Sequence, residues 1–230
     1  MFQDLGVVIV AGGCSSRFSG KNKLLEKING IPLFLYSINN FIDVCNSENI
    51  ILVCSKDYFE SYKKYFKKYH SDKSISFTLG GATRSESVFN GLKYLNNKVK
   101  YTAVHDAARP LVSNELIQKC YESCKKSGSG VAAKRVTDTV KLIDNSNRVL
   151  NTVDRTNLWT IETPQVFILS ELVSAYKEII SNNIMVTDDA GAMEIYGKDV
   201  YIVENAKPNT KITYTSDLTY LKYLLNNSFN

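Results

Sequence analysis

Histidines, cysteines and long apolar runs are all scarce in this sequence of 230 residues. Its two histidines, His70 and His105, do not form a cluster with the spacing of zinc ligands. Its five cysteines, an odd number, indicate reduced thiols rather than a disulfide framework. No apolar run reaches the roughly eighteen residues of a membrane helix, and the N-terminus lacks the basic flank and cleavage site of a signal peptide. These absences predict a cytoplasmic protein that does not contact a membrane.

Two common nucleotide-binding motifs are absent as well. There is no G-x-G-x-x-G fingerprint followed by an acidic residue, which argues against a dehydrogenase-like dinucleotide-binding protein, and no G-K-[ST] ending of a P-loop. The net charge of +5 is mild, and the basic residues are densest in residues 56–73. Aromatic side chains recur in that segment at helical spacing. This spacing favours a helix that packs on the core over a face that binds nucleic acid.

What the sequence does contain is a run of β-branched residues that leads directly into a loop of small residues. Residues 7–10 favour a buried strand, and Ala11 and the Gly12-Gly13 pair follow it. Backbone N–H groups in such a loop can surround an anion without steric hindrance. Arg17 and Lys23 add two positive charges, a combination that suits a triphosphate. The alternative is a tight structural turn with solvated cations, and this loop alone leaves both open.

Apolar strands alternate with amphipathic helices along most of the chain, which predicts an α/β protein with a mostly parallel sheet and helices on both faces. No linker interrupts this order, so we expect one domain over residues 1–230. The expected strands are residues 7–10, 50–54, 75–79, 101–105, 131–134 and 200–203. The expected helices include residues 32–41, 114–126 and 170–181, with two more beginning near Thr187 and Ser216 as N-caps.

Residues 135–157 depart from this alternation. Residues 137–143 and 149–153 form two extended runs joined by a polar turn, which predicts a β-hairpin arm. We expect such an arm to pack on a second subunit.

Two further stretches place polar residues directly after expected strands. Gly80 and Gly81 open a second loop of small residues, and Arg84 follows where free N–H groups begin a helix. Asp106 ends another strand, where a carboxylate can hold Mg²⁺ on a triphosphate. A helix cap or a turn ion pair with Arg109 is the alternative. The carboxyl ends of parallel strands share one edge, so we expect a ligand crevice there.

Seven blocks of sequence, in their order and spacing, extend over nearly the whole chain. They are AGGCSSRF with Lys23, GGATRSESVFNGL, VHDAARPLV, VTDTVKLI, DRTNLWTIETPQVF, TDDAGAMEIYG and NTKIT. Together they resemble the 2-C-methyl-D-erythritol 4-phosphate cytidylyltransferases of the non-mevalonate isoprenoid pathway. The resemblance implies a homodimeric, Rossmann-like nucleotidyltransferase that uses CTP and Mg²⁺, or another divalent cation. Its products would be 4-diphosphocytidyl-2-C-methyl-D-erythritol and pyrophosphate.

The resemblance also implies roles for individual residues. It places CTP against Ala11, Gly12, Gly13, Gly80, Gly81, Arg84, Ser87, Asp106 and Ala107. It places the sugar-alcohol phosphate against Asp106, Arg109, Thr139, Arg155, Thr163, Thr187 and Lys211, with the arm reaching into the partner's site. It gives catalytic roles to Arg17, Lys23, Arg155 and Lys211, and makes Asp106 the metal-associated acid, acting mainly through the CTP phosphates.

This chemistry agrees with the residues present. A phosphate monoester has its second pKa at about 6, so at neutral pH it is mostly dianionic and attacks without a general base. The cations are then needed to hold it in line and to stabilise charge on the five-coordinate phosphorus. Some residues depart from the family's usual pattern: Asn22 and Leu24 flank the lysine in place of Pro and Gln, Glu162 replaces Gln, and Asp189 and Gly191 replace Glu and Ser.

Two other functions fit the same resemblance less well. A ribitol 5-phosphate cytidylyltransferase would share the fold, but the Leu158-Trp159 pair favours the methylerythritol branch. A non-catalytic nucleotide-binding regulator need not retain Arg17, Lys23, Asp106, Arg155 and Lys211 together, as this chain does.

Overall fold

A central seven-stranded sheet organises the part of the chain that the computed structural model describes, residues 1–12 and 22–227. Its strands are β1 (Leu5–Ala11), β4 (Ile50–Cys54), β5 (Ser76–Leu79), β6 (Tyr101–Asp106), β7 (Ser129–Arg135), β10 (Trp159–Ile168) and β11 (Ile202–Glu204). They lie in the order β11-β7-β10-β6-β1-β4-β5. β1 pairs in parallel with β4 and β6, β5 with β4, and β11 with β7. The predicted α/β fold with a mostly parallel sheet is confirmed.

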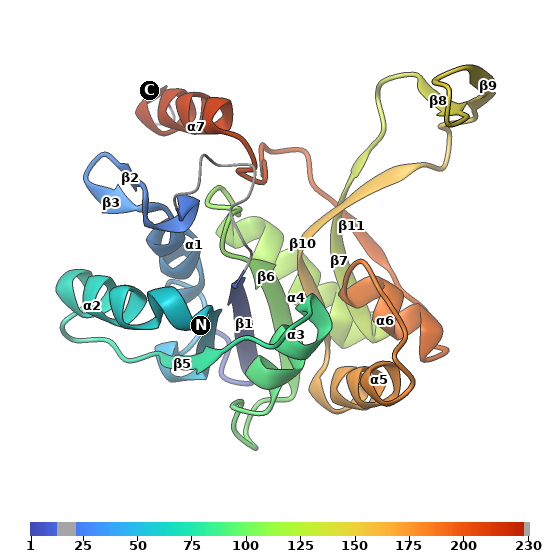
Figure 1. Ribbon diagram of the computed structural model, residues 1–230. Helices are drawn as coiled ribbons and strands as arrows, with labels where there is room; N and C mark the ends of the chain where they lie inside the picture. The colour runs from blue at the N-terminus through green and yellow to red at the C-terminus, as the bar shows by residue number, and fades with distance from the viewer. Residues whose placement is uncertain (13–21, 228–230) are drawn as a thin grey trace.

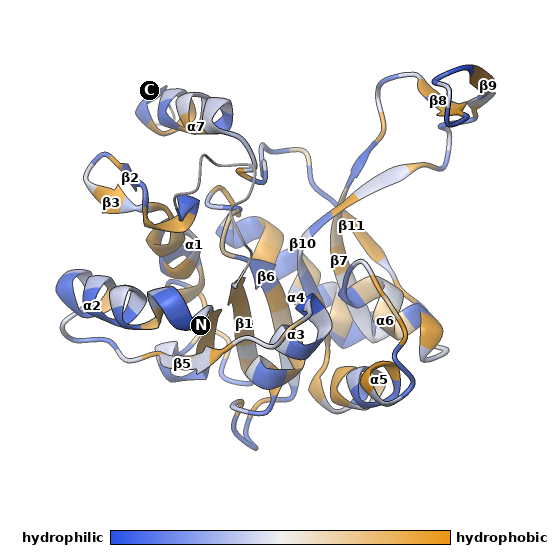
Figure 2. Ribbon diagram, in the orientation of Figure 1, coloured by the Kyte–Doolittle hydropathy of each residue, from blue (hydrophilic) through white to orange (hydrophobic). Residues whose placement is uncertain are grey.

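Helices cover both faces of this sheet (Figure 1). Buried side chains of α1 (Leu33–Ile42), α2 (Phe59–Tyr69) and α4 (Asn114–Ser127) share one core, and those of α3 (Arg84–Leu92), α5 (Leu169–Ser181) and α6 (Asp189–Ile195) share another. Strand β1 contributes to both, because alternate side chains point to opposite faces: Val7 and Ile9 enter the first core and Val8 the second. Figure 2 shows the apolar residues concentrated along these strands.

The aromatic stripe of residues 56–73 packs inward, as the spacing predicted. Tyr62 and Phe66 of α2 are buried in the first core. The short 3-10 turns η2 (Ser47–Asn49) and η3 (Lys56–Tyr58) flank β4. The two-residue strands β2 (Lys27–Ile28) and β3 (Ile31–Pro32) form a small hairpin before α1.

Strand β10 is the main element that the sequence pattern did not predict. It runs antiparallel between β6 and β7 in the middle of the sheet. Its pairing with β7 shifts register between Ile161 and Gln165. The shift interrupts the ladder where the strand passes the carboxyl end of β6, so residues 162–164 pair with neither neighbouring strand, whereas Gln165 pairs with Val104 and Val131.

Two predicted helix caps are wrong. The N-cap of α6 is Asp188 rather than Thr187, because the Asp188 carboxylate accepts the N–H of Gly191 at 3.0 Å. The last helix, α7 (Thr215–Asn227), already includes Ser216, and the carboxylate of Asp217 accepts the N–H groups of Thr213 and Tyr214. The last strand also begins at Ile202 rather than at residue 200.

The predicted hairpin is present and stands apart from the sheet. Strands β8 (Val140–Ile143) and β9 (Val149–Val153) pair antiparallel at the end of two long connections (Figure 1). Four large apolar side chains of this arm are exposed: Leu142, Ile143, Val149 and Leu150. Among the described residues, no helix is long and apolar enough to cross a membrane.

Candidate active site

Two cavities lie side by side at the carboxyl edge of the parallel strands. The first cavity, about 470 Å³, is bounded by the end of β1 at Gly12, by Lys23, and by the loop between β5 and α3. The second cavity, about 570 Å³, is bounded by residues 161–165 of β10 and by the start of α6. Arg84, Asp106 and Lys211 line both. The two cavities therefore meet at one charged junction.

The loop between β5 and α3 shapes the first cavity. Gly81 lies so close to α3 that a Cβ there would approach Glu86 Cβ to 2.3 Å, which explains the need for glycine. Its N–H donates to Ser87 Oγ at 3.0 Å, and the N–H of Ala82 donates to Glu86 Oε2 at 2.6 Å. Side chains of the first turn of α3 therefore bind the N–H groups of Gly81 and Ala82.

Arg84, in the first turn of α3, is anchored by a buried acid. Its guanidinium binds both carboxylate oxygens of Asp189, at 3.1 and 2.6 Å, and the Asp189 side chain is fully buried. The Tyr176 hydroxyl donates to the same carboxylate. Burial alone would lower the pKa of Arg84, but the attraction of Asp189 outweighs it and raises the pKa above its ordinary value. Arg84 therefore presents a fixed positive charge to both cavities.

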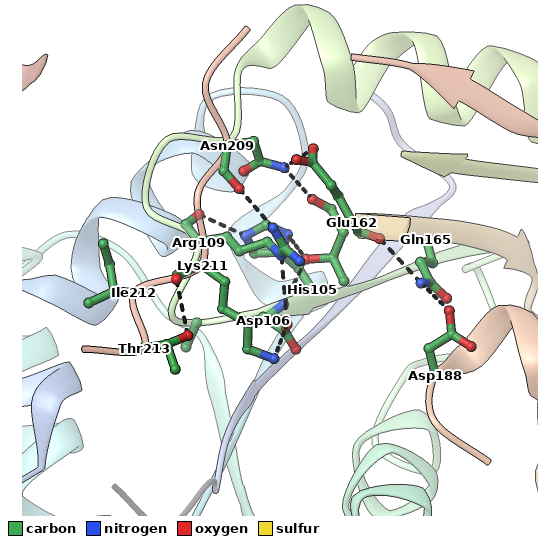
Figure 3. A network of polar contacts seen from close by, with 12 residues as sticks. His105, Asp106, Arg109, Glu162, Gln165, Asp188, Asn209, Lys211, Ile212 and Thr213 are labelled. Atoms are coloured by element: carbon green, nitrogen blue, oxygen red, sulfur yellow. Dashed lines mark hydrogen bonds and ion pairs between the residues drawn. The ribbon is translucent and has the colours of Figure 1, made fainter. Parts of the chain in front are cut away.

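Asp106 forms the centre of the junction (Figure 3). Its carboxylate lies 2.7 Å from Lys211 Nζ and 3.7 Å from Arg109 Nε. Burial would raise the pKa of Asp106, but Lys211, with smaller effects from Arg84 and Arg109, holds it below its ordinary value. The ion pair with Arg109 that the sequence left open is present.

His105, next to Asp106, is a structural residue. It is fully buried, and its Nε2 donates to the carbonyl of Arg109 at 3.1 Å while its Nδ1 accepts from the Thr163 hydroxyl at 3.0 Å. Thr163 Oγ1 in turn accepts the N–H of Asp106 at 3.1 Å. Burial lowers the pKa of His105 to about 4, so the ring is neutral at physiological pH. Thr163 thus fixes the end of β6 on which Asp106 lies.

Lys23 reaches the first cavity from the short 3-10 turn η1 (Lys23–Leu25). Asn22 caps this turn, since its side-chain oxygen accepts the N–H of Leu24 at 3.0 Å. The Asn22 amide also donates to the buried Tyr62 hydroxyl at 3.0 Å. The ammonium of Lys23 donates to the carbonyl of Ile212 at 2.6 Å. Asn22, which departs from the family's usual residue, therefore ties the lysine to α2.

The family model for 2-C-methyl-D-erythritol 4-phosphate cytidylyltransferase matches residues 5–227 of this chain. The chain belongs to that family. The cytidylyltransferase of this name from Dictyoglomus thermophilum is 38% identical over 223 residues, which cover 96% of each chain. Two crystal structures agree: 4-diphosphocytidyl-2C-methyl-D-erythritol synthase from Anaerococcus prevotii has a TM-score of 0.84 at 29% identity, covering 96% of this chain and 98% of that one. The Francisella tularensis 2-C-methyl-D-erythritol 4-phosphate cytidylyltransferase has 0.80 at 33% identity, covering 96% and 99%.

Family membership confirms the predicted reaction class. The chain is a nucleotidyltransferase that transfers a cytidylyl group from CTP to 2-C-methyl-D-erythritol 4-phosphate, in isoprenoid precursor biosynthesis. The regulator alternative is set aside, and both the family model and the relatives favour methylerythritol phosphate over ribitol 5-phosphate.

The structure brings most of the residues that the resemblance implied into the two cavities. Gly12, Lys23, Gly81, Arg84, Ser87, Asp106 and Lys211 line the first, and Arg109, Thr163 and Thr187 join Arg84, Asp106 and Lys211 in the second. Ala11 ends β1 beside Gly12, Gly80 precedes Gly81, and Ala107 follows Asp106. Gly13 and Arg17 lie outside the described residues.

Thr139 and Arg155 lie elsewhere. Both are exposed in the arm, and the Arg155 guanidinium donates to the carbonyl of Thr137. Neither is among the described residues that line the two cavities of this chain.

Several polar residues of the second cavity were not predicted as site residues. Gln165 donates to Asp188 Oδ2 at 2.9 Å and accepts the N–H of Ala190 at 2.8 Å, which fixes the start of α6 against β10. Glu162 and the nearby Asn209 join the network around Arg109 (Figure 3). The family resemblance placed Thr163 of the segment 162–165 at the same ligand as Asp106, but without β10 in the predicted sheet the sequence pattern gave no position for Glu162 and Gln165.

Proposed function

We propose that the first cavity binds CTP and the second binds 2-C-methyl-D-erythritol 4-phosphate. In this proposal CTP lies against Ala11, Gly12, Gly13, Gly80, Gly81, Arg84, Ser87, Asp106 and Ala107. The alcohol phosphate lies against Asp106, Arg109, Thr163, Thr187 and Lys211, with Thr139 and Arg155 supplied by a partner subunit. One observation carries the proposal: the two cavities share Arg84, Asp106 and Lys211, where a nucleotide phosphate and an attacking phosphate have to meet.

The reaction then needs charge stabilisation rather than a base. The acceptor phosphate is mostly dianionic at neutral pH, so an oxygen of it forms a bond to the α-phosphorus of CTP while the bond to the β-phosphate oxygen breaks and pyrophosphate leaves. Lys211 and Arg109 hold the attacking phosphate, and Lys23 and Arg17 stabilise the charge that develops at the α-phosphorus. His105 takes no part in proton transfer, because its ring is buried and fully hydrogen-bonded.

A divalent cation, Mg²⁺ in our proposal, would be held mainly by CTP. No group of three or more His, Cys, Asp or Glu side chains among the described residues could hold a metal ion. Of the three described residues that both cavities share, Asp106 offers the carboxylate, and a carboxylate plus phosphate oxygens is a donor set that suits Mg²⁺. When bound, the ion neutralises charge on the triphosphate.

The arm completes the proposal as a dimer contact. We propose a single nucleotidyltransferase domain over residues 1–230, from which the arm at about 135–157 extends to a second copy. The exposed apolar side chains of β8 and β9 support this, because apolar groups at the tip of an arm favour contact with another surface. Within a homodimer, Thr139 and Arg155 would reach the partner's second cavity.

We also propose a cytoplasmic location. The thiols of Cys45, Cys54, Cys120 and Cys124 are free and buried, and burial raises the pKa of each to about 12. Unpaired thiols are typical of a reducing compartment.

The proposal is tested by pyrophosphate release from CTP and Mg²⁺, with 2-C-methyl-D-erythritol 4-phosphate and ribitol 5-phosphate compared in parallel. We expect strong preference for the first. Lys23→Ala should lower kcat about a hundredfold, the usual loss for one preorganised electrostatic group. Lys27→Ala, which removes a lysine of β2 beside Tyr65, is the matched control and should leave the rate unchanged. Preference for ribitol 5-phosphate would contradict the substrate, and a normal rate for Lys23→Ala would contradict the site.

A further inference from the structure

Glu162 connects two buried asparagines beside the second cavity. Its Oε2 atom accepts from Asn205 Nδ2 at 2.9 Å and from Asn209 Nδ2 at 3.0 Å. Asn205 follows β11, and Asn209 lies four residues further along; both are at least 95% buried, with exposed fractions of 5% and 3%. Glu162 itself belongs to β10, so one carboxylate oxygen on the central antiparallel strand holds both ends of the loop 205–209.

This loop leads directly into the residues that set the charged junction. The carbonyl of Asn209 accepts from Arg109 Nη1 at 2.8 Å, and the N–H of Ile212 donates to the carbonyl of Ala108 at 2.8 Å. Lys211 lies between these two attachment points and reaches Asp106. Asn209 also donates to the carbonyl of Thr163 at 2.9 Å. The position of Lys211 therefore depends on Asn209, and Asn209 depends on Glu162 (Figure 3).

We propose that Glu162 is a positioning residue for the transfer reaction: through Asn205 and Asn209 it sets the path of residues 209–212 and thereby aims Lys211 and Arg109 at the acceptor phosphate. The inference rests on the proposed function of the second cavity. It assigns to Glu162 a role as hydrogen-bond acceptor rather than as a charge, because both amides bind the same oxygen atom. An amide oxygen has the two lone pairs that this arrangement needs.

The test compares Glu162→Ala with Glu162→Gln in steady-state kinetics with CTP and 2-C-methyl-D-erythritol 4-phosphate. Alanine removes the Glu162 acceptor from the Asn205 amide and one of the two acceptors of the Asn209 amide. We therefore expect the KM for the alcohol phosphate to rise about tenfold or more while the KM for CTP changes less than about twofold. Glutamine keeps the acceptor oxygen and should stay within about threefold of the wild type for both substrates. Glu204→Ala is the control, since this neighbour of Asn205 pairs with Arg135 at the surface.

A double-mutant cycle with Lys211→Ala decides whether Glu162 acts through Lys211. If it does, Glu162→Ala should cost much less in kcat/KM on the Lys211→Ala background than on the wild type. Full additivity would overturn the inference, as would wild-type kinetics for Glu162→Ala, equal increases in both KM values, or a Gln variant as impaired as the Ala variant. If Lys211→Ala alone leaves the rate unchanged, the proposed function of the second cavity fails instead. Far-UV circular dichroism checks that each variant is folded.

Discussion

His105 is the residue at which the site and the stability of the fold are most directly linked. The native ring is neutral, with its pKa lowered by burial to about 4, whereas the unfolded chain has an ordinary histidine pKa of 6.5. Between these values the unfolded state binds a proton that the native state does not, so stability falls as the pH is lowered from 6.5 to 4. The fully developed loss is about 3 kcal/mol from this group.

Urea unfolding of the wild type and of His105→Gln at pH 7 and at pH 4.5 or so measures this contribution. Glutamine can still accept and donate hydrogen bonds but does not titrate, so we expect its stability to fall less on acidification. Carboxylates with lowered pKa, Asp106 among them, contribute to the pH dependence of both proteins and cancel in the comparison. Equal pH dependence in the two proteins would mean that the native ring becomes protonated without penalty.

Single residues were predictable where a motif fixes their distance from a strand end. Asp106 was expected at the end of its strand, and the strand ends on it. Asp189 and Asn209 were not expected in the site, because their importance depends on side chains far away in the sequence: Arg84 for the first and Arg109 for the second. The helix-capping pattern around Thr187 does not reveal that Asp189 binds Arg84. It also predicted Thr187 as the N-cap of α6, whereas the N-cap is Asp188.

Among the elements, α3 depends on close approach to the sheet. Gly91 of this helix faces β1 and β4, and a Cβ there would lie 2.5 Å from Val8 Cγ1 and 2.8 Å from Val53 Cγ2. Gly91→Ala should therefore push the helix outward and lower the free energy of unfolding by about 1–3 kcal/mol, the usual cost of overpacking a core. Urea unfolding measures the change.

The matching control for Gly91→Ala is the double variant with Val8→Ala. Removing the valine methyl groups vacates the space that the new Cβ needs, so the two substitutions together should cost less than the sum of their separate effects. Simple additivity would show that the helix accommodates the methyl group without contact. Because α3 also carries Arg84 and Ser87, we expect the KM for CTP to rise in Gly91→Ala and to recover in the double variant.

Elements with a regular apolar period were predictable and β10 was not. Strand β4 consists entirely of apolar residues and β6 is half apolar, and the bounds of both followed closely from the sequence pattern. β10 contains Glu162, Thr163, Pro164 and Gln165 in its middle, where the ladder is interrupted and the strand faces a polar cavity. Glu162, Thr163 and Gln165 line the second cavity. The strand therefore lacks, in this segment, the apolar alternation by which a strand is predicted.

At the scale of the whole molecule, the sequence predicted the arm as a hairpin but could not say where its residues act. Hydropathy and turn patterns in a sequence predict the helices and strands of one chain. They do not distinguish a site shared between two copies from a site within one copy. The described chain keeps Arg155 away from its own two cavities, with its guanidinium on the carbonyl of Thr137. If the arm reaches a second copy, each active site combines the body of one subunit with the arm of the other.

Subunit complementation tests this arrangement. Lys23→Ala disables the body of a site and Arg155→Ala disables the arm, so each purified homodimer should be nearly inactive, the second mainly through a raised KM for the alcohol phosphate. In a mixed dimer the body with Lys23 meets the arm with Arg155, and one of its two sites is intact. Random exchange of equal amounts should thus restore roughly a quarter of the wild-type activity. If Arg155 served the cavities of its own chain, each site of the mixed dimer would lack one residue and no activity would return, which is the result that would overturn the shared site. An affinity tag on only one of the two variants shows, by co-purification of the other, whether exchange took place.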